Sequence, residues 1–330
     1  MKALVTGGGG FLGGAIVRLL RERGDCVVSL SRGSYPELER LGVEQVNGDL
    51  GDREAVVRAA AGCDIVFHVA AKAGIWGDYA DFYRANVTGT ENVIAACREN
   101  GITRLVHTSS PSVVFDGRDV EGGNESLPYP SRYEAHYPRT KAIAERIVLA
   151  ADSTELATTA LRPHLIWGPG DNHLVPRIIA KARAGRLRRI GSRPCLVDTV
   201  YVDNAARAHL QAADRLSAGS PPAGRAYFIS NGEPIPLWEM VNRILAAAGL
   251  PAVERSVSPK VAYAAGVICE ALWGALRLPG EPPVTRFVAH ELATAHWFDI
   301  GAARRDLGYE PEISIDEGLI RLREWLSGKG

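Results

Sequence analysis

The sequence predicts an α/β protein, built on a Rossmann-type, doubly wound parallel sheet with a smaller, mainly C-terminal substrate-binding lobe. Three observations support this fold class. Short β-rich apolar runs alternate with helical patterns, a glycine-rich turn follows the first run, and hydroxyl residues end a later run. Strands that alternate with helices form parallel sheets with helices on both faces, and 330 residues are enough for one such large unit.

Candidate strands and helices alternate through the first half of the chain. Apolar runs bounded by turn residues predict strands at 2–6, 26–31, 44–46, 64–70, 104–109 and 158–167. Apolar residues at helical spacing predict helices near 12–23, 53–61, 84–99 and 137–151. We therefore predict a nucleotide-binding Rossmann domain at 1–170, completed by a returning strand and helix near 196–217.

The second half of the chain has a less regular pattern. Clusters of Pro and Gly at 220–224 and 278–283 separate helical stretches near 203–217, 236–249 and 259–277. We predict that residues 171–330 form mainly a substrate-binding lobe that is interleaved with the sheet.

Segment 261–278 in this lobe is almost continuously apolar. Its length approaches that of a membrane span, but Glu270 near its middle and the lack of flanking anchors argue against a transmembrane helix. Three roles remain open for it: the wall of an alkyl tunnel, a buried core or dimer-interface helix, and a contact with a membrane surface.

Composition is typical of a folded soluble protein, with 46% hydrophobic and 23% charged residues. Lys plus Arg and Asp plus Glu balance at 38 each, so no positive field favours nucleic acid as a partner. The five cysteines lack zinc or redox spacing, which predicts small buried residues in a reducing compartment and no metal site. The N-terminal apolar stretch is too short for a signal sequence, and we expect a cytoplasmic protein.

A glycine loop lies directly after the first predicted strand. Gly7, Gly10 and Gly13 are spaced as in dinucleotide-binding turns, with Phe11 and Leu12 opening the following helix. Glycines allow a tight turn and close approach of the backbone to a pyrophosphate, and the helix N-terminus favours its negative charge. A purely structural turn is the alternative, which the strand before it and the helix after it make improbable.

The residues after the second strand favour NADP(H) over NAD(H). A carboxylate there would bind the ribose 2′-hydroxyl, but the chain has Ser31 and Arg32, which offer a small donor and a planar cation for a 2′-phosphate. The alternative is that Arg32 is a solvated loop residue. After the third strand, Asp49 and Leu50 are expected at the adenine ring, although Asp49 could instead cap the helix that starts at Asp52.

Tyr137 and Lys141 form the predicted catalytic pair. Residues four apart lie on the same face of a helix, so the Lys141 ammonium can lie beneath the phenol and favour its ionised form. An unperturbed tyrosine has a pKa of about 10, and a nearby cation shifts it toward a working pH. Tyr133, one turn earlier, is a competitor, but it has no lysine four residues on.

Hydroxyl residues at the end of the fifth strand complete this set. Ser110 is the predicted group that orients a substrate carbonyl, with Ser109 as the fallback; one of the two is expected to cap backbone groups instead. His68 and His107 lie within strands, where a buried structural histidine is the commoner outcome.

Further cofactor contacts are predicted where neighbouring strands end. Ala70, Ala71 and Lys72 follow the fourth strand, and the backbone from Pro163 to Ile166 follows the sixth strand, where it is placed to hold the nicotinamide carboxamide. His164 is expected to line the pocket.

These motifs, in this order, resemble the extended short-chain dehydrogenase/reductase superfamily over nearly the whole chain. The resemblance rests on the glycine loop, the Tyr-Lys pair, and segments 68–71, 86–90, 108–110, 161–163 and 167–171. Segments 112–117, 201–204, 227–231 and 304–311 resemble its 3β-hydroxysteroid dehydrogenase branch. Within that branch, segments 71–77, 140–146, 161–173, 226–234 and 276–281 are similar to the bacterial reductases of 2-alkyl-3-oxoalkanoic acids in head-to-head olefin biosynthesis.

The resemblance implies NADPH-dependent reduction of the 3-keto group of a 2-alkyl-3-oxo fatty acid to the 3-hydroxy acid. Tyr137 would be the proton donor, Lys141 would tune its pKa and contact the ribose, and Ser110 would orient the carbonyl. The family also suggests a homodimer and assembly with other olefin-pathway enzymes. For the substrate carboxylate, Arg193, Arg286 and Lys72 remain open candidates.

Three rival functions are considered. A 3β-hydroxysteroid or sterol dehydrogenase is the main alternative, because an apolar lobe suits either ligand. A nucleotide-sugar epimerase or dehydratase is less favoured, because a dehydratase typically has acidic residues after the strand-end hydroxyl, where this chain has Pro111 and Ser112. A protein that kept the fold and lost catalysis is disfavoured by the intact Tyr137, Lys141 and Ser110.

Overall fold

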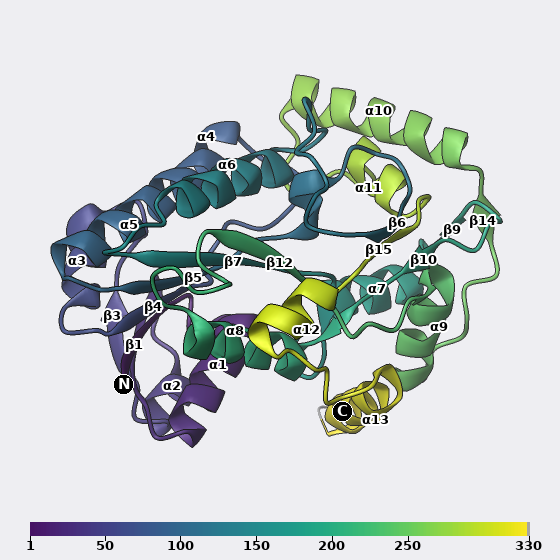
Figure 1. The fold of residues 1–330 in the computed structure, drawn as a ribbon. Coiled ribbons are helices and arrows are strands. Elements are labelled where there is room, and N and C mark those ends of the chain that lie inside the picture. Colours follow the sequence, from purple (N-terminus) through teal and green to yellow (C-terminus); the bar gives the residue numbers. More distant parts are fainter. Residues whose placement is uncertain (329–330) are drawn as a thin grey trace.

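A seven-stranded parallel sheet lies at the centre of the computed structural model, which describes residues 1–328 (Figure 1). The strand order is β12-β7-β5-β4-β1-β2-β3. The strands are β1 (Lys2–Thr6), β2 (Cys26–Ser31), β3 (Glu44–Asn47), β4 (Ile65–His68), β5 (Arg104–Thr108), β7 (Ala157–Pro163) and β12 (Arg225–Ile229). Strand order reverses between β1 and β4, and sheets of this kind bind ligands beyond the carboxyl ends of the strands at that point.

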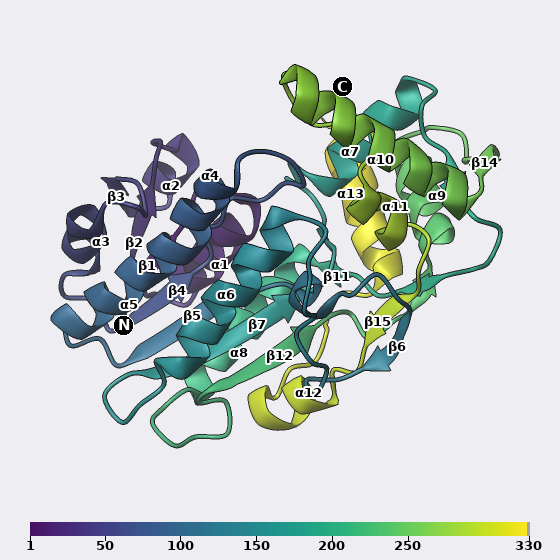
Figure 2. The same ribbon diagram turned by 90° about the horizontal axis from the view of Figure 1, so that it is seen from above.

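Helices cover both faces of this sheet (Figures 1 and 2). One face packs against α3 (Arg53–Ala60), α5 (Gly89–Glu99) and α6 (His136–Ala150), and the other against α1 (Phe11–Glu22) and α8 (Val202–Arg215). Neighbouring strand residues alternate between the two cores: Leu4 and Val66 belong to one, Val5 and Phe67 to the other. The predicted fold class is therefore confirmed.

A smaller sheet lies beyond the carboxyl ends of the main strands (Figure 2). It consists of β13 (Ile235–Pro236), β10 (Leu196–Val197), β15 (His296–Phe298) and β6 (Val120–Gly123). Two short strand pairs accompany it, β8 (Ile166–Trp167) with β11 (Val200–Tyr201), and β9 (Arg189–Ile190) with β14 (Ser256–Val257). The helices of the second half are α7 (Leu174–Arg183), α9 (Leu237–Ala247), α10 (Pro259–Leu276), α11 (Arg286–Glu291), α12 (Gly301–Leu307) and α13 (Ile315–Ser327). The division of the chain at residue 170 stays a prediction.

The strand expected at 158–167 is interrupted. Strand β7 ends at Pro163, and β8 begins at Ile166. Between them Leu165 has a φ of 44°, in the left-handed region that a continuous strand does not allow. The chain therefore leaves the main sheet at this point and enters the smaller lobe.

Three other features differ from the sequence expectations. The helix expected at 84–99 begins as the π-helical turn η1 (Arg84–Thr88) and continues as α5. Strand β12 follows the Pro-rich segment 220–224 and was not predicted. The expectation that the cysteines are buried is wrong for Cys26, which is exposed because it opens β2 at the rim of the sheet, and for Cys269, which is only half-buried.

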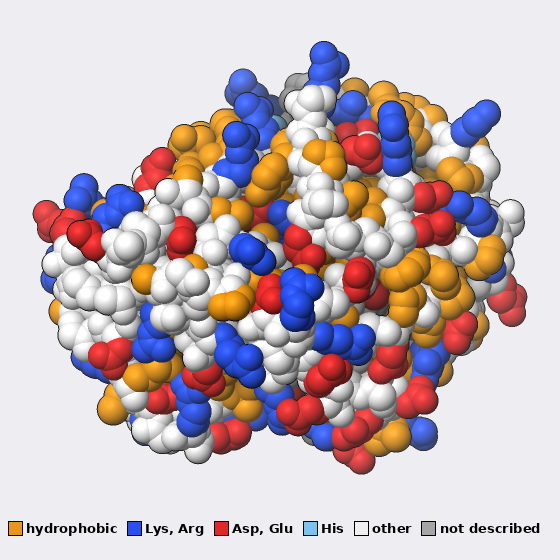
Figure 3. Space-filling view, in the orientation of Figure 1, with side chains coloured by type: hydrophobic (Ala, Val, Ile, Leu, Met, Phe, Trp, Pro, Cys, Tyr) orange, Lys and Arg blue, Asp and Glu red, His pale blue; other side chains and the backbone are white. Residues whose placement is uncertain are grey.

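Helix α10 lies at the outside of the smaller lobe (Figure 1). Its buried residues are Ala262 and Gly266, and a Cβ on Gly266 would lie 2.7 Å from the amide nitrogen of Arg286 at the start of α11. The large apolar residues Val261, Val267, Ile268, Leu272 and Leu276 of this helix are exposed. Figure 3 shows hydrophobic side chains gathered at the upper right, where α10 lies in Figure 1. Within residues 1–328, no helix has both the length and the apolar content for crossing a membrane.

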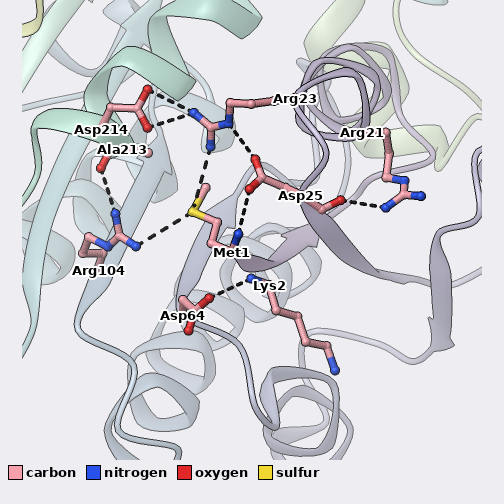
Figure 4. A network of polar contacts seen from close by, with 9 residues as sticks. All are labelled: Met1, Lys2, Arg21, Arg23, Asp25, Asp64, Arg104, Ala213 and Asp214. Carbon is pink, nitrogen blue, oxygen red and sulfur yellow. Dashed lines mark hydrogen bonds and ion pairs between the residues drawn. The ribbon is translucent and has the colours of Figure 1, made fainter.

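A polar network joins the elements at the opposite edge of the sheet (Figure 4). The N-terminal amine of Met1 donates to Asp25 at 2.9 Å, and Arg23 binds both Asp25 at 2.6 Å and Asp214 at 2.8 Å. These contacts connect β1, the turn before β2 and the end of α8. They stabilise the amino ends of the strands. The predicted site residues lie at the other end of the sheet, at the carboxyl ends of the strands.

Candidate active site

The turn between β1 and α1 requires glycine at two positions. Gly7 has a φ of 72°, and a Cβ on it would lie 3.0 Å from the Cβ of Ala70. A Cβ on Gly13 would lie 2.1 Å from the carbonyl oxygen of Gly7. The amide of Gly10 donates to that carbonyl at 2.9 Å, and among residues 1–328 no side chain caps α1. The first-turn amides of α1 are therefore available to an anion.

The residues after this turn open α1. Phe11 is the first residue of the helix, and Leu12 packs its side chain into the core, which leaves the Leu12 backbone at the sheet edge. The prediction of a dinucleotide-binding turn is consistent with this geometry.

Ser31 and Arg32 lie at the end of β2, beside the glycine loop. Ser31 is the last residue of the strand, and Arg32 is exposed; none of the residues at 1–328 forms an ion pair or hydrogen bond with its guanidinium. The ring of Tyr35 packs against the loop, since a Cβ on Gly9 would lie 2.3 Å from it. Arg32 is thus available to bind an anionic group.

Asp49 and Leu50 follow β3. The Asp49 carboxylate accepts from the amide of Gly51 at 2.8 Å. The cap of α3 is Asp52, which accepts from the amide of Ala55 at 3.2 Å. The alternative role of Asp49 as the helix cap is therefore wrong, and its contact with an adenine ring stays a prediction.

The segment after β4 is held in place by Asn86, which sequence reasoning missed as a positioning residue. Its side chain accepts from the Lys72 amide at 2.7 Å, donates to the Lys72 carbonyl at 3.2 Å, and donates to the Thr140 hydroxyl of α6 at 3.0 Å. Asn86 thereby connects the predicted cofactor segment of Ala70, Ala71 and Lys72 to the helix that carries Tyr137.

Lys141 is buried, and its ammonium contacts β5. Its ammonium donates to the Thr108 carbonyl at 2.6 Å and lies 3.2 Å from Nε2 of His107. Burial lowers the pKa of Lys141 to about 8. The negative charge of Glu145, one turn further along α6, acts to raise this pKa but does not cancel the effect of burial. Burial and the Lys141 charge lower the pKa of His107, so its neutral ring can accept from the ammonium.

Tyr137 lies in the first turn of α6 and is partly buried. Burial raises the pKa of its phenol, and hydrogen bonding to Ser110 opposes the rise without cancelling it. The expected lowering by Lys141 is therefore absent in the protein alone, because the ammonium is directed at Thr108 and His107. Tyr133, the competitor, donates its hydroxyl to the Val113 carbonyl at 2.9 Å.

The two serines after β5 have different surroundings. Ser110 caps the 3-10 turn η2 (Pro111–Val114) by accepting from the Ser112 amide at 3.2 Å, and its hydroxyl lies 2.9 Å from that of Ser112; hydrogen bonding by Ser110 also acts to lower the pKa of Tyr137. Ser109 is only 4% exposed, and within residues 1–328 its hydroxyl has no hydrogen-bond partner. Ser110 is therefore the serine that a substrate beside Tyr137 can contact.

A buried ion pair anchors α6 to the sheet. Arg162 on β7 donates to Glu145 through Nε at 2.9 Å and Nη2 at 2.7 Å, and the Tyr129 hydroxyl donates to the same carboxylate at 2.6 Å. Glu145 lies four residues after Lys141, so this contact fixes the part of the helix next to the catalytic pair.

Pro163 ends β7 and Ile166 opens β8, on either side of the left-handed Leu165. His164 between them is buried, and its Nδ1 lies 2.5 Å from Asp198. Its Nε2 lies 3.2 Å from Nδ1 of His296. His164 is therefore part of a buried chain that fixes this turn. The nicotinamide contacts of Pro163 and Ile166 stay predictions.

A cleft of about 560 Å³ opens between the catalytic helix and the smaller lobe. Its walls include His136 beside Tyr137, Trp76 of the segment after β4, and Val267 of α10. Arg286 also lines it and is bound to Glu270 at 2.7 Å. One side of α10 therefore forms a wall of the cleft, while its outer side is exposed.

The other two cations proposed for a substrate carboxylate have partners outside this cleft. Arg193 is bound to Asp119 at 2.6 Å, and Lys72 to Asp81 at 2.8 Å. Neither belongs to the cleft lining. Of the three candidates, only Arg286 is placed at the cleft.

Glu291, which the sequence did not indicate, affects the phenol although it does not belong to the cleft lining. It ends α11, and its charge raises the pKa of the Tyr137 phenol, which places it within electrostatic range of that group. Burial raises the pKa of Glu291 to about 8. No local pattern signals such a residue, since a single carboxylate in a polar helix is usually solvated.

Comparisons with known proteins agree with this geometry. Residues 4–259 match the model of the 3-beta hydroxysteroid dehydrogenase/isomerase family. The chain is 57% identical over 325 residues to a Stenotrophomonas maltophilia protein named 2-alkyl-3-oxoalkanoate reductase, with 98% of both chains covered. It is 51% identical over 329 residues to a Shewanella oneidensis protein of the same name, covering 97% of this chain and 85% of that one.

Solved structures show the same fold. The structure of gox2253 matches with a TM-score of 0.79 at 26% identity, covering 99% of this chain and 98% of that chain. MoeE5 in complex with UDP-glucose and NAD matches with a TM-score of 0.75 at 26% identity, covering 100% of this chain and 99% of that chain. The resemblance read from the sequence is confirmed: the chain belongs to the 3-beta hydroxysteroid dehydrogenase/isomerase family of the extended short-chain dehydrogenases/reductases.

Proposed function

We propose that this chain is an NADPH-dependent reductase that converts 2-alkyl-3-oxoalkanoic acids to 2-alkyl-3-hydroxyalkanoic acids in head-to-head olefin biosynthesis. The observation that carries the proposal is that Tyr137, Lys141 and Ser110 come from α6 and the end of β5, and that a partly apolar cleft is lined by His136 of the same helix. Its substrate class is supported by the 57% and 51% identical relatives that are named for this reaction.

The residues at the sheet edge fit a nicotinamide dinucleotide. Gly7 and Gly13 have no room for a Cβ, and the first-turn amides of α1 can bind a pyrophosphate. The exposed Arg32 suits a 2′-phosphate, and no carboxylate lies at the end of β2 to repel it. When bound there, NADPH supplies the hydride for the substrate carbonyl carbon.

Tyr137 is the proposed proton donor. Its raised pKa keeps the phenol protonated at neutral pH, which is the state that a donor to a carbonyl oxygen needs. As C3 is reduced, the phenolic proton would pass to the C3 oxygen, and the Lys141 ammonium would favour the phenolate left behind. Ser110 would donate a hydrogen bond to the same oxygen and orient the carbonyl.

The cleft supports an apolar substrate. Ile75, Trp76, Val267 and Ala271 contribute apolar walls, and they come from two segments far apart in the sequence. Ligand sites of this kind bury alkyl groups against apolar side chains and use a few polar groups for orientation. We propose that the alkyl chains of the substrate lie along α10.

The quaternary and cellular setting is proposed from the family resemblance. We propose a homodimer in the cytoplasm that works beside the other enzymes of the olefin pathway. Gel filtration with light scattering tests the dimer, and a monomer at all concentrations would contradict it.

The test of the reaction is oxidation of a synthetic 2-alkyl-3-hydroxy fatty acid, because the 3-oxo acid decarboxylates too readily to be a clean substrate. NADP⁺ and NAD⁺ are compared, and a 3β-hydroxysteroid is the competing substrate. We expect turnover of the fatty acid with NADP⁺. Turnover of the steroid alone would assign a steroid dehydrogenase, and turnover only with NAD⁺ would overturn the role of Arg32.

A further inference from the structure

His107 is a buried residue of β5 that contacts the predicted catalytic lysine. It is 1% exposed, and its Nε2 lies 3.2 Å from the Lys141 ammonium. The same ammonium donates to the Thr108 carbonyl at 2.6 Å. The other ring nitrogen of His107, Nδ1, is buried and has no hydrogen-bond partner among residues 1–328. Within that part of the chain, Lys141 is therefore the hydrogen-bond partner of this ring.

Two other buried histidines have partners for both ring nitrogens. Nε2 of His68 lies 2.9 Å from the Thr90 hydroxyl, and its Nδ1 lies 2.9 Å from the Thr6 hydroxyl. His209 contacts the Thr108 hydroxyl at 2.8 Å through Nε2 and a carbonyl of its own helix at 2.7 Å through Nδ1. Both rings connect neighbouring parts of the fold and are fully paired, as expected of structural histidines.

The contact with Lys141 determines which nitrogen of His107 carries the proton. Burial and the Lys141 charge lower the pKa of His107, so its ring is neutral at neutral pH. An ammonium only donates, so Nε2 must accept from it and Nδ1 must carry the proton. A buried N–H group without an acceptor is destabilising. Packing alone therefore does not explain a histidine here, next to the apolar Leu105 and Val106 of the same strand, whereas the contact with Lys141 does.

The carboxylate nearest to Lys141 along α6 is already paired. Glu145 accepts from Arg162 at 2.9 Å and 2.7 Å, and from the Tyr129 hydroxyl at 2.6 Å. Its charge acts to raise the pKa of Lys141, but across residues 1–328 no carboxylate forms an ion pair with the ammonium. The ammonium is therefore held by two neutral acceptors, a backbone carbonyl and the ring of His107.

The titratable groups that face His107 from β4, α8 and the start of α6 carry no charge at neutral pH. The ring of His68 lies 5.0 Å from that of His107, and burial lowers the pKa of His68 to about 3. Burial lowers the pKa of His209 to about 4 and raises that of the Tyr137 phenol. The Lys141 ammonium is therefore the charge that the His107 ring contacts.

We propose that His107 is a positioning residue of the catalytic pair: its Nε2 accepts from the Lys141 ammonium, keeps Lys141 charged, and holds it at the end of β5. This inference rests on the proposed roles of Tyr137 and Lys141. A hydrogen bond to the charged form of a group favours that form. Removing the acceptor should therefore move the titration of Lys141 to lower pH, by about one to two pH units for a hydrogen bond to a charged group.

The first test reads the tautomer of His107 in the wild-type protein. Long-range ¹H–¹⁵N NMR spectra of the full chain with ¹⁵N-labelled histidine show which ring nitrogen carries the proton. The His107 signals are assigned by their absence from His107→Gln. At pH 7 we expect the proton on Nδ1 and none on Nε2. A proton on Nε2 would overturn the proposal, because that nitrogen could not then accept from Lys141.

The second test follows the charge of Lys141 itself. The ¹³Cε signal of labelled lysine, assigned by its absence from Lys141→Met, is titrated from pH 6 to pH 11. For the wild type we expect a midpoint of about 8. His107→Phe keeps a ring but has no acceptor, and its midpoint should be about one to two units lower. His107→Gln offers an amide oxygen in place of Nε2 and should restore the wild-type midpoint.

A matched control separates this effect from a general disturbance of the core. His209→Gln changes another buried histidine that contacts Thr108 and should keep the wild-type midpoint of Lys141. A residue that only fills space would lower the amount of folded protein without moving the midpoint. An unchanged midpoint in His107→Phe, or an equal fall in His209→Gln, would overturn the role of His107.

The kinetic consequence follows from the charged fraction of Lys141. A midpoint one to two units lower than about 8 leaves about twofold to tenfold less ammonium at pH 7. The kcat for NADP⁺-dependent oxidation of a 2-alkyl-3-hydroxy fatty acid should fall by the same factor in His107→Phe and recover in His107→Gln. If the wild type does not oxidise the fatty acid, the proposed function fails, and both NMR results still decide whether His107 accepts from Lys141. If the wild type turns over and His107→Phe keeps the wild-type kcat, only the role of His107 fails.

Discussion

Replacing Arg162 with methionine should destabilise the protein and disturb the helix that carries Tyr137 and Lys141. Arg162 is 3% exposed and binds Glu145 through two nitrogens, at 2.9 Å and 2.7 Å. Glu145 is 0% exposed, and it also accepts a hydrogen bond from the Tyr129 hydroxyl. Without the guanidinium, the carboxylate would keep its burial and lose its charge partner.

The expected loss follows from this burial. Removing one partner of a buried ion pair costs about 3–5 kcal/mol, because the remaining charge is uncompensated. Burial acts to raise the pKa of Glu145, but the hydrogen bonds and charge of Arg162 outweigh it and lower that pKa. In the wild type the ion pair therefore stabilises the fold fully at pH values above the unfolded pKa of the Glu145 carboxyl, about 4.3. This contribution is lost as the pH falls through the lower folded pKa of the same group.

In the variant the sign is reversed. Burial alone would raise the folded pKa of Glu145, so the destabilisation is full above that raised pKa, shrinks as the pH falls below it, and is gone below the unfolded pKa of about 4.3. Urea unfolding at pH 7 and pH 5 measures both effects for Arg162→Met and for Arg162→Met combined with Glu145→Gln. The double variant should recover at least half of the loss. A loss below about 1 kcal/mol at pH 7, or an equal loss in the double variant, would refute this reasoning.

Three other substitutions test the cofactor and catalytic residues. Lys141→Met should slow NADP⁺ reduction at least a hundredfold. Burial holds the folded pKa of Lys141 at about 8, below the unfolded value, so burying its charge costs up to about 3 kcal/mol below pH 8 and nothing above about pH 10.4. The free energy of unfolding of the variant minus that of the wild type, measured in urea, should therefore be larger at pH 7 than at pH 10. An equal value at the two pH values would contradict this. Gly7→Ala should weaken NADPH binding at least tenfold in a fluorescence titration, because its φ is 72° and Ala70 lies 3.0 Å from the new Cβ; unchanged affinity would contradict the tight turn. Arg32→Glu should lower the NADP⁺-to-NAD⁺ ratio of kcat/KM about tenfold to a hundredfold. Arg40→Glu, at another exposed arginine, is the control for the change in charge. An unchanged ratio in Arg32→Glu would exclude Arg32 from the phosphate site.

The main sheet was largely predictable because its signals are local. The runs that form β1, β2, β4 and β5, and the helices between them, follow the spacing of apolar residues over short windows. The break at Leu165 was not predictable, because tertiary contacts fix it: the amide of His164 donates to the Ile229 carbonyl at 3.0 Å, and its ring binds Asp198. Strand β12 depends likewise on pairing with β7, and its Pro-rich approach obscured it.

The candidate site was predictable in part for the same reason. The glycine loop and the pair of Tyr137 and Lys141 are patterns within a few residues. The buried chain from Asp198 through His164 to His296 joins residues separated by 34 and 132 positions, and no local spacing indicates it. The environment of Glu291 also depends on packing between distant segments. The pKa of Tyr137 was mispredicted because helical spacing places Lys141 near the phenol but does not show that its ammonium binds the backbone of β5.

The central claim is that Tyr137 donates and accepts the proton during reduction of a 3-oxo acid. The most direct measurement compares kcat for NADP⁺-dependent oxidation of a 2-alkyl-3-hydroxy fatty acid in the wild type, Tyr137→Phe and Tyr133→Phe, with NADPH affinity measured in parallel. Tyr133 is the matched control, because it lies four residues before Tyr137, outside α6, and its hydroxyl binds the Val113 carbonyl. We predict that Tyr137→Phe lowers kcat by about 10²–10⁴ with NADPH affinity unchanged, while Tyr133→Phe stays within a few fold of the wild type. Wild-type turnover by Tyr137→Phe would contradict the account.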